Sequence, residues 1–125
     1  MKSDAVRLAD YLDHVVQAID RIGRHVGLLN EAEFFSSELV QDAVIRNLEV
    51  IGEASRNIQK NFPEFVAAHP QLPLAFAYQM RNAVAHGYFK VDLAIVWRTV
   101  QTDLLTFKAS VTDALNALPP EIRSS

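Results

Sequence analysis

Apolar residues recur at intervals of three and four positions through most of this chain, which is the period of an α-helix with one buried face. The first run is Leu8, Leu12, Val15, Ile19, Ile22 and Val26, and the second is Val40, Val44, Leu48, Ile51, Ala54 and Ile58. The last run is Leu93, Val96, Val100, Leu104, Phe107, Val111 and Leu115, and a helix-compatible segment from Leu74 to His86 precedes it. Four amphipathic segments without strand-like alternation predict an all-α bundle of four helices.

Capping and helix-breaking residues set the expected ends of these helices. Ser36 or Ser37 can cap the second helix, because a serine hydroxyl accepts a hydrogen bond from a free amide of the first turn. Pro63 ends that helix, since proline lacks the amide hydrogen and disfavours helix in the residue before it. Residues 27–35 lack the helical period and are predicted to form a connection, and residues 65–67 are predicted to add one short helical turn.

The last helix has similar signals at both ends. Asp92 is its expected N-cap, and Pro119 and Pro120 follow its final apolar positions. We therefore expect the C-terminal tail, from about residue 119, to be irregular.

The length of 125 residues predicts a single domain over residues 1–125 with one core. The formal net charge of −3 lacks the basic excess of proteins that bind long stretches of nucleic acid, so any RNA contact is expected to be local. The absence of cysteine excludes disulfides and thiolate chemistry and suits a reducing compartment. The start of the chain is amphipathic and no run is long enough to cross a bilayer, so a cytoplasmic protein without a membrane partner is expected.

The segment from Arg81 to Tyr88 combines groups suited to phosphate chemistry. Asn82 and His86 are four positions apart and share a helix face, and Arg81 reaches the same region through its long side chain. Gly87 is the expected stop of that helix, which places His86 in the last turn. There the negative end of the helix dipole favours the imidazolium form. A guanidinium for phosphate and an imidazole for proton transfer are thus expected to converge.

Each of these residues also has a purely structural interpretation. Arg81 could be a surface arginine that pairs with a nearby carboxylate. His86 could only cap its helix, because a helix C-terminus by itself favours histidine. Tyr88 could be an amphipathic residue at the edge of the core.

Gly52 and Glu53 lie inside the second predicted helix. Glycine in a helix interior costs about 1 kcal/mol relative to alanine, so Gly52 is expected to mark the close approach of another helix. Glu53 could pair with Arg81 or Arg56, or it could remain solvated, and we assign it no catalytic role.

His14, His25 and His69 are scattered, and no pair of them shares a helix face with a carboxylate at ligand spacing, so no metal site is predicted. Several cations are expected to be solvated, although they could also line a path for RNA. They are Arg21, Arg24, Arg46, Arg56, Lys60 and Lys90.

Arg81 is followed by the polar residue Asn82, and His86 comes after three further residues. One residue then separates His86 from Tyr88. This order resembles the signature of the HEPN superfamily. More narrowly, the chain resembles the HepT-like HEPN toxins of toxin–antitoxin pairs whose partner is a minimal nucleotidyltransferase. Residues 42–48 and 51–54 resemble the long second helix of that family, and Met80 and the pair Val96-Trp97 also fit. The resemblance extends from about Tyr11 to Leu115.

This resemblance implies a HEPN-type antiparallel four-helix bundle with a short extra helix, assembled as a homodimer in which two signature segments meet in one cleft. It implies a type VII-like toxin that cleaves RNA without a metal ion or other cofactor, by attack of the ribose 2′-hydroxyl. Arg81 and His86 would lie in the catalytic site, with Asn82 orienting them. Tyr88 matches the tyrosine to which the partner nucleotidyltransferase attaches AMP groups in related toxins.

Two other functions fit parts of the sequence. A noncatalytic nucleotide- or protein-binding module would use Arg81 to hold phosphates, with His86 only as a helix cap. The complete set of Arg81, Asn82, His86 and Tyr88 favours the enzyme, because binding alone needs no proton carrier. A purely structural helical protein would bury this segment in a dimer interface, and solvent access to His86 would distinguish it from the other two.

Overall fold

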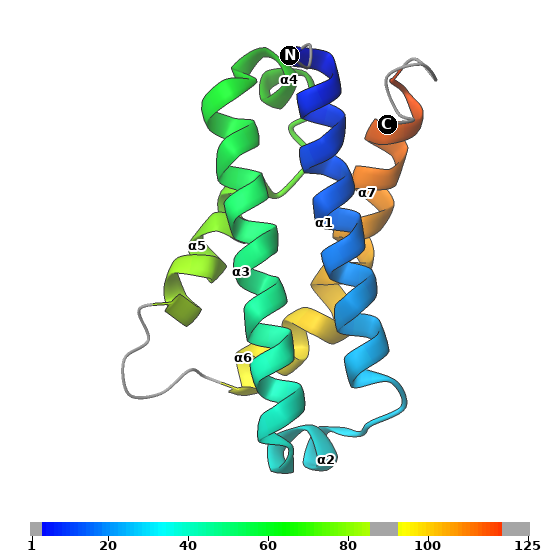
Figure 1. Cartoon of the computed structure of the whole chain (residues 1–125), viewed down its shortest axis with the longest axis vertical. Helices are drawn as coiled ribbons and strands as arrows, with labels where there is room; N and C mark the ends of the chain where they lie inside the picture. The colour runs from blue at the N-terminus through cyan, green and yellow to red at the C-terminus, as the bar shows by residue number, and fades with distance from the viewer. Residues whose placement is uncertain (1–3, 86–92, 119–125) are drawn as a thin grey trace.

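A computed structural model describes residues 4–85 and 93–118, and these residues form helices without any strand (Figure 1). The long helices are α1 (Asp4–Val26), α3 (Glu38–Asn61) and α5 (Leu74–Ala85). The last long segment consists of α6 (Leu93–Arg98), the π-helix η1 (Thr99–Asp103) and α7 (Leu104–Asn116). The short helices are α2 (Glu31–Ser36) and α4 (Pro63–Ala68). The predicted all-α bundle is confirmed for the described residues.

The long helices pack side by side and run in alternating directions (Figure 1). α3 lies between α1 and α5, and α7 packs against α1. The core forms where the predicted apolar faces meet: Leu12, Val15, Val44 and Val111 are completely buried. Among the described helices, none combines the length and the apolar character that are needed to cross a bilayer.

The connection predicted for residues 27–35 contains a helix, so this part of the prediction is wrong. Gly27 ends α1 with a φ of +53°, the left-handed conformation that glycine adopts without a Cβ clash. Asn30 then starts α2 with a capping box, in which its side chain accepts from the amide of Glu33 and the Glu33 carboxylate accepts from the amide of Asn30. Phe34 of α2 is completely buried, so this short helix covers one end of the core.

The predicted boundaries of α3 are confirmed. Ser37 is its N-cap, and the hydroxyl of that residue accepts a hydrogen bond from the amide of Val40. The helix ends at Asn61, and Pro63 begins α4, where the sequence predicts one short turn. α5 starts at Leu74 as predicted and is described up to Ala85.

A π-helical turn divides the last predicted helix. Val96, Val100 and Leu104 are all buried. Each follows the previous one by four residues, so Leu104 is two gaps of four after Val96, whereas two α-helical turns contain only ~7.2 residues. The wider turn of η1 keeps these side chains on the core face. The predicted Asp92 cap and the irregular tail from about residue 119 lie outside the described residues.

Candidate functional site

α5 packs against α3 at Gly52, in the middle of the bundle. A Cβ built on Gly52 would overlap the Cβ of Arg81 and lie 3.0 Å from the carbonyl oxygen of Ala77. This confirms that Gly52 marks the close approach of another helix. The absence of a side chain at this position lets α5 bring Arg81 directly against α3.

Among the described residues, two side chains hold the guanidinium of Arg81. Its Nη2 lies 2.8 Å from Oε1 of Glu53 on α3, and its Nη1 donates a hydrogen bond of 2.9 Å to Oδ1 of Asn82. Glu53 therefore pairs with Arg81, whereas the guanidinium of Arg56 lies 5.3 Å from the ring centre of Tyr78. The Arg81 side chain is 27% exposed and that of Glu53 is 55% exposed, so the ion pair is partly exposed to solvent.

Arg81 keeps N–H groups that an anion can bind. A guanidinium presents several donors in a planar fork, and among the described residues Glu53 and Asn82 each engage one terminal nitrogen. The Nε of Arg81 is buried, and no hydrogen-bond partner for it occurs in the described part of the chain. A phosphate that reaches the remaining terminal N–H groups would meet a guanidinium whose orientation is already fixed.

A polar groove runs past Arg81 between α1, α3 and α5. Its volume is about 310 Å³. The floor is one face of α3, which contributes Arg46, Glu49, Val50, Glu53, Ala54 and Asn57. Tyr11 and His14 of α1 line one side, and Arg81 of α5 lines the other. Arginines, carboxylates and an imidazole from three helices therefore share one solvent-accessible site.

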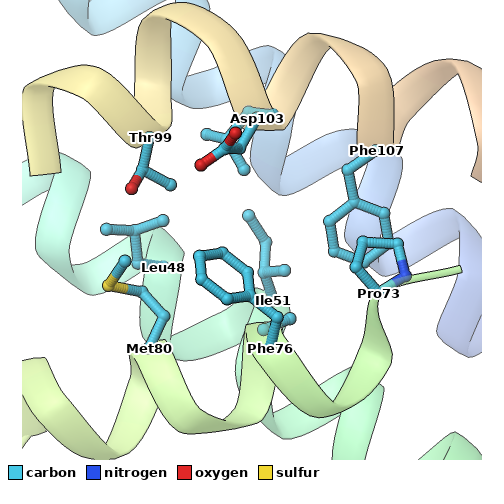
Figure 2. A pocket seen from close by; sticks show the side chains of 10 residues that line it. Leu48, Ile51, Pro73, Phe76, Met80, Thr99, Asp103 and Phe107 are labelled. Carbon is cyan, nitrogen blue, oxygen red and sulfur yellow. The ribbon is translucent and has the colours of Figure 1, made fainter. Parts of the chain in front are cut away.

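A second cavity is mainly apolar and lies between α5 and η1 (Figure 2). Phe76 and Met80 of α5 face Thr99 and Asp103 of η1 across it, and Leu48 of α3 lies behind them. Its volume of about 30 Å³ holds only a water molecule or two. This cavity contains neither an arginine nor a histidine, so the polar groove is the candidate site.

The histidines outside the Arg81-to-Tyr88 segment have different surroundings. His14 lines the polar groove, and His25 is exposed near the end of α1. Nδ1 of His69 lies 2.9 Å from the carbonyl oxygen of Phe65. The imidazole of His69 also stacks on the phenyl ring of Phe65, with the ring centroids 4.2 Å apart. In residues 4–85 and 93–118, no group of three or more potential metal ligands occurs.

The structure brings the predicted site residues together in part. Arg81 and Asn82 share a hydrogen bond on α5, whereas His86 and Tyr88 lie outside the described residues. Sequence reasoning misses Tyr11 and His14 as groove residues, because nothing in the sequence of α1 indicates that this helix borders Arg81.

A family model and several curated relatives match most of the chain. The family described as Ribonuclease HepT-like matches residues 15–114. A probable ribonuclease HepT of Thermococcus cleftensis is 37% identical over 99 residues, which cover 79% of this chain and 87% of that protein. A protein of Caldanaerobacter subterraneus named "Putative RNase" is 30% identical over 105 residues, which cover 84% of this chain and 91% of that protein.

A longer relative comes from Methanocaldococcus jannaschii and is named "Gamma-glutamylcyclotransferase and putative RNase". It is 33% identical over 108 residues, which cover 86% of this chain. They cover 47% of that protein, so the chain spans about half of that relative's length. No solved structure gives a significant match to the chain.

Proposed function

The chain belongs to the HepT-like ribonuclease family and is thus an RNA endonuclease, and we propose that it cleaves RNA without a metal ion, with Arg81 and His86 as catalytic residues. The observation that supports this proposal is the fixed guanidinium of Arg81. Glu53 and Asn82 orient it while N–H groups remain for a phosphate. A preorganised cation of this kind stabilises the charge that develops on phosphoryl oxygens in the transition state.

In the proposed reaction, the ribose 2′-hydroxyl attacks the adjacent phosphorus and the 5′-oxygen leaves. One imidazole takes the proton of the hydroxyl, and another gives a proton to the leaving oxygen. The products are a 2′,3′-cyclic phosphate and a 5′-hydroxyl, so the step consumes no water. Arg81 binds the nonbridging oxygens, and Asn82 keeps the guanidinium in place by accepting its hydrogen bond.

We propose that a homodimer supplies the two imidazoles, since each chain contributes one His86. In this arrangement α5 faces its mate across a two-fold axis, and both Arg81-to-Tyr88 segments border one cleft. Positive charge is then concentrated in the cleft, which reconciles an RNA substrate with a net charge of −3 for each chain. Light scattering of the purified protein should give twice the mass of one chain, and a monomer mass would contradict this arrangement.

RNA cleavage in the presence of excess EDTA tests the proposed function. The purified protein is expected to cleave at the same rate with and without EDTA, because proton transfer by imidazole and charge stabilisation by guanidinium need no metal ion. A metal-dependent ribonuclease in parallel reactions shows that the chelator is effective. Loss of cleavage in EDTA, with recovery on addition of Mg²⁺, would contradict the metal-independent mechanism.

We further propose that the protein is the toxin of a type VII-like toxin–antitoxin pair, acting on RNA in the cytoplasm and neutralised by a minimal nucleotidyltransferase. The hydroxyl of Tyr88 would attack the α-phosphorus of ATP and pyrophosphate would leave, so that Tyr88 carries AMP. The added phosphate lies in the same segment as Arg81 and would compete with RNA for its guanidinium.

Incubation with the cognate nucleotidyltransferase and ATP is expected to raise the intact mass by one or more AMP units and to abolish RNA cleavage. Tyr88→Phe should remain unmodified, because it lacks the attacking hydroxyl. Tyr78→Phe is the matched control, since it removes a hydroxyl from a tyrosine of α5 three positions before Arg81 and should be modified like the parent. An unmodified parent, or equal modification of Tyr88→Phe, would show that Tyr88 is not the target.

A further inference from the structure

We propose that the polar groove between α1, α3 and α5 binds a nucleotide that lies a few positions from the cleaved bond of the RNA, with Arg46 on its phosphate and His14 against its base. This inference rests on the proposed ribonuclease function and adds a second phosphate site to the one at Arg81. It gives the groove a role in positioning the RNA strand relative to Arg81.

Arg46 provides an anchor that is separate from Arg81. Arg46 and Glu53 both line the groove from α3, because their spacing of seven residues is close to two helical turns. The same spacing separates them by about 10.5 Å along the helix axis. Glu53 fixes Arg81, so the two arginines lie at different points along the groove. A strand stacked at about 3.4 Å per nucleotide covers that distance with a few nucleotides.

Arg46 is also available for an anion. Its side chain is exposed, and among the described residues no carboxylate lies within salt-bridge distance of it. Arginine binds phosphate through paired N–H groups, so a phosphate in the groove would find donors at this position.

An aromatic pair lies across the groove from Arg81. The rings of His14 and Tyr11 meet edge to face, with centroids 6.4 Å apart and planes at 83°. Tyr11 is supported in turn by an edge contact with Phe62, with centroids 6.3 Å apart. His14 is exposed, and an edge-to-face contact covers at most one face of its imidazole. Unpaired RNA bases commonly stack on rings of this kind.

The carboxylates of the groove favour a nucleotide over other anions. Glu49 and Glu53 line the same floor as Arg46, so a ligand that offers only negatively charged groups would be repelled by these carboxylates. A nucleotide offers a phosphate to the arginine and offers hydroxyl and amino donors to the carboxylates. The volume of about 310 Å³ is within the range of small-ligand pockets.

Binding of a fluorescent single-stranded RNA at several salt concentrations tests this proposal. All variants contain His86→Ala so that the RNA stays intact, and EDTA is present throughout. Arg46→Gln is expected to weaken binding about tenfold. It should also reduce the slope of log affinity against log salt by about 0.7, as expected for the loss of one phosphate contact on a single strand. His14→Leu, at pH 8, should weaken binding about fivefold without changing the slope, because stacking releases no counterions.

Arg24→Gln is the matched control, since it removes the same charge from an exposed arginine of α1 that does not line the groove. Its affinity and salt slope should equal those of the background protein. Arg46→Glu should weaken binding more than Arg46→Gln does. Arg46 and His14 are both exposed, and thermal unfolding verifies that each variant keeps the parent's stability.

Equal effects of Arg46→Gln and Arg24→Gln would overturn the proposal, because the change would then reflect net charge alone. An unchanged affinity of His14→Leu would overturn the base contact. If Arg46→Gln weakens binding of the nucleotidyltransferase and leaves RNA affinity unchanged, the groove is a protein-binding site and the proposal fails. If the background protein binds no RNA, the proposed function itself fails, whereas RNA binding without an Arg46 effect contradicts this inference alone.

Discussion

Arg81→Ala is expected to cleave RNA about 10³-fold more slowly than the parent, because it removes the oriented donors for the nonbridging oxygens. Glu53 and Asn82 fix the guanidinium before RNA binds, at 2.8 and 2.9 Å respectively, so its stabilising effect requires no rearrangement during the reaction. The ion pair with Glu53 is partly exposed to solvent, so its loss should lower the free energy of unfolding by at most about 1 kcal/mol. Single-turnover cleavage rates and thermal unfolding measure the two effects separately.

Two conservative variants distinguish the guanidinium's geometry from its charge. Arg81→Lys keeps the charge but loses the planar fork, so its rate should fall between those of the parent and Arg81→Ala. Glu53→Gln keeps an acceptor for Nη2 and removes only the opposing charge, so it should slow cleavage less than Arg81→Ala does. A rate for Arg81→Ala within about tenfold of the parent would show that Arg81 does not stabilise the transition state.

Gly52→Ala is expected to lower the free energy of unfolding by about 2 kcal/mol and to slow RNA cleavage. In an ordinary helix interior the same change stabilises by about 1 kcal/mol. Here the added Cβ overlaps the Cβ of Arg81 and lies 3.0 Å from the carbonyl oxygen of Ala77. α5 must then move away from α3, which separates Arg81 from Glu53. Urea denaturation measures the stability, and the cleavage rate reports on the displaced guanidinium.

Gly23→Ala is the matched control for this change. Gly23 lies in α1, and a Cβ built there would have no neighbouring atom within 4 Å. This variant should gain about 0.5 to 1 kcal/mol of stability and keep the parent's cleavage rate. The two glycine variants should therefore change stability in opposite directions. If Gly52→Ala is stabilised as Gly23→Ala is, α5 does not approach α3 as the structure describes.

The long helices could be predicted from the sequence because their apolar intervals and end signals are local. Ser37 and Pro63 mark the two ends of α3 in the sequence, and the structure places them there. α2 is too short to show a helical period. The sequence feature that marks its start is the capping box of Asn30 and Glu33. The π-turn of η1 could not be predicted, because the apolar face of a continuous α-helix is wide enough to include two successive gaps of four residues.

The candidate site was less predictable, because it depends on how distant segments pack. Asn82 is adjacent to Arg81, so their proximity follows directly from the sequence. Glu53 had two possible arginine partners, and the approach of α5 at Gly52 decides in favour of Arg81. Tyr11 and His14 border the groove because α1 packs beside α3, and no local pattern reveals that neighbourhood.

The proposed catalytic role of His86 is tested most directly by RNA cleavage in EDTA with the parent and His86→Ala side by side, followed by analysis of the product ends. We expect the parent to cleave and to leave 2′,3′-cyclic phosphates, while the variant keeps its fold and its oligomeric state but does not cleave. Cleavage by His86→Ala at the rate of the parent would contradict this role. Products with 3′-hydroxyl ends would contradict the attack by the 2′-hydroxyl.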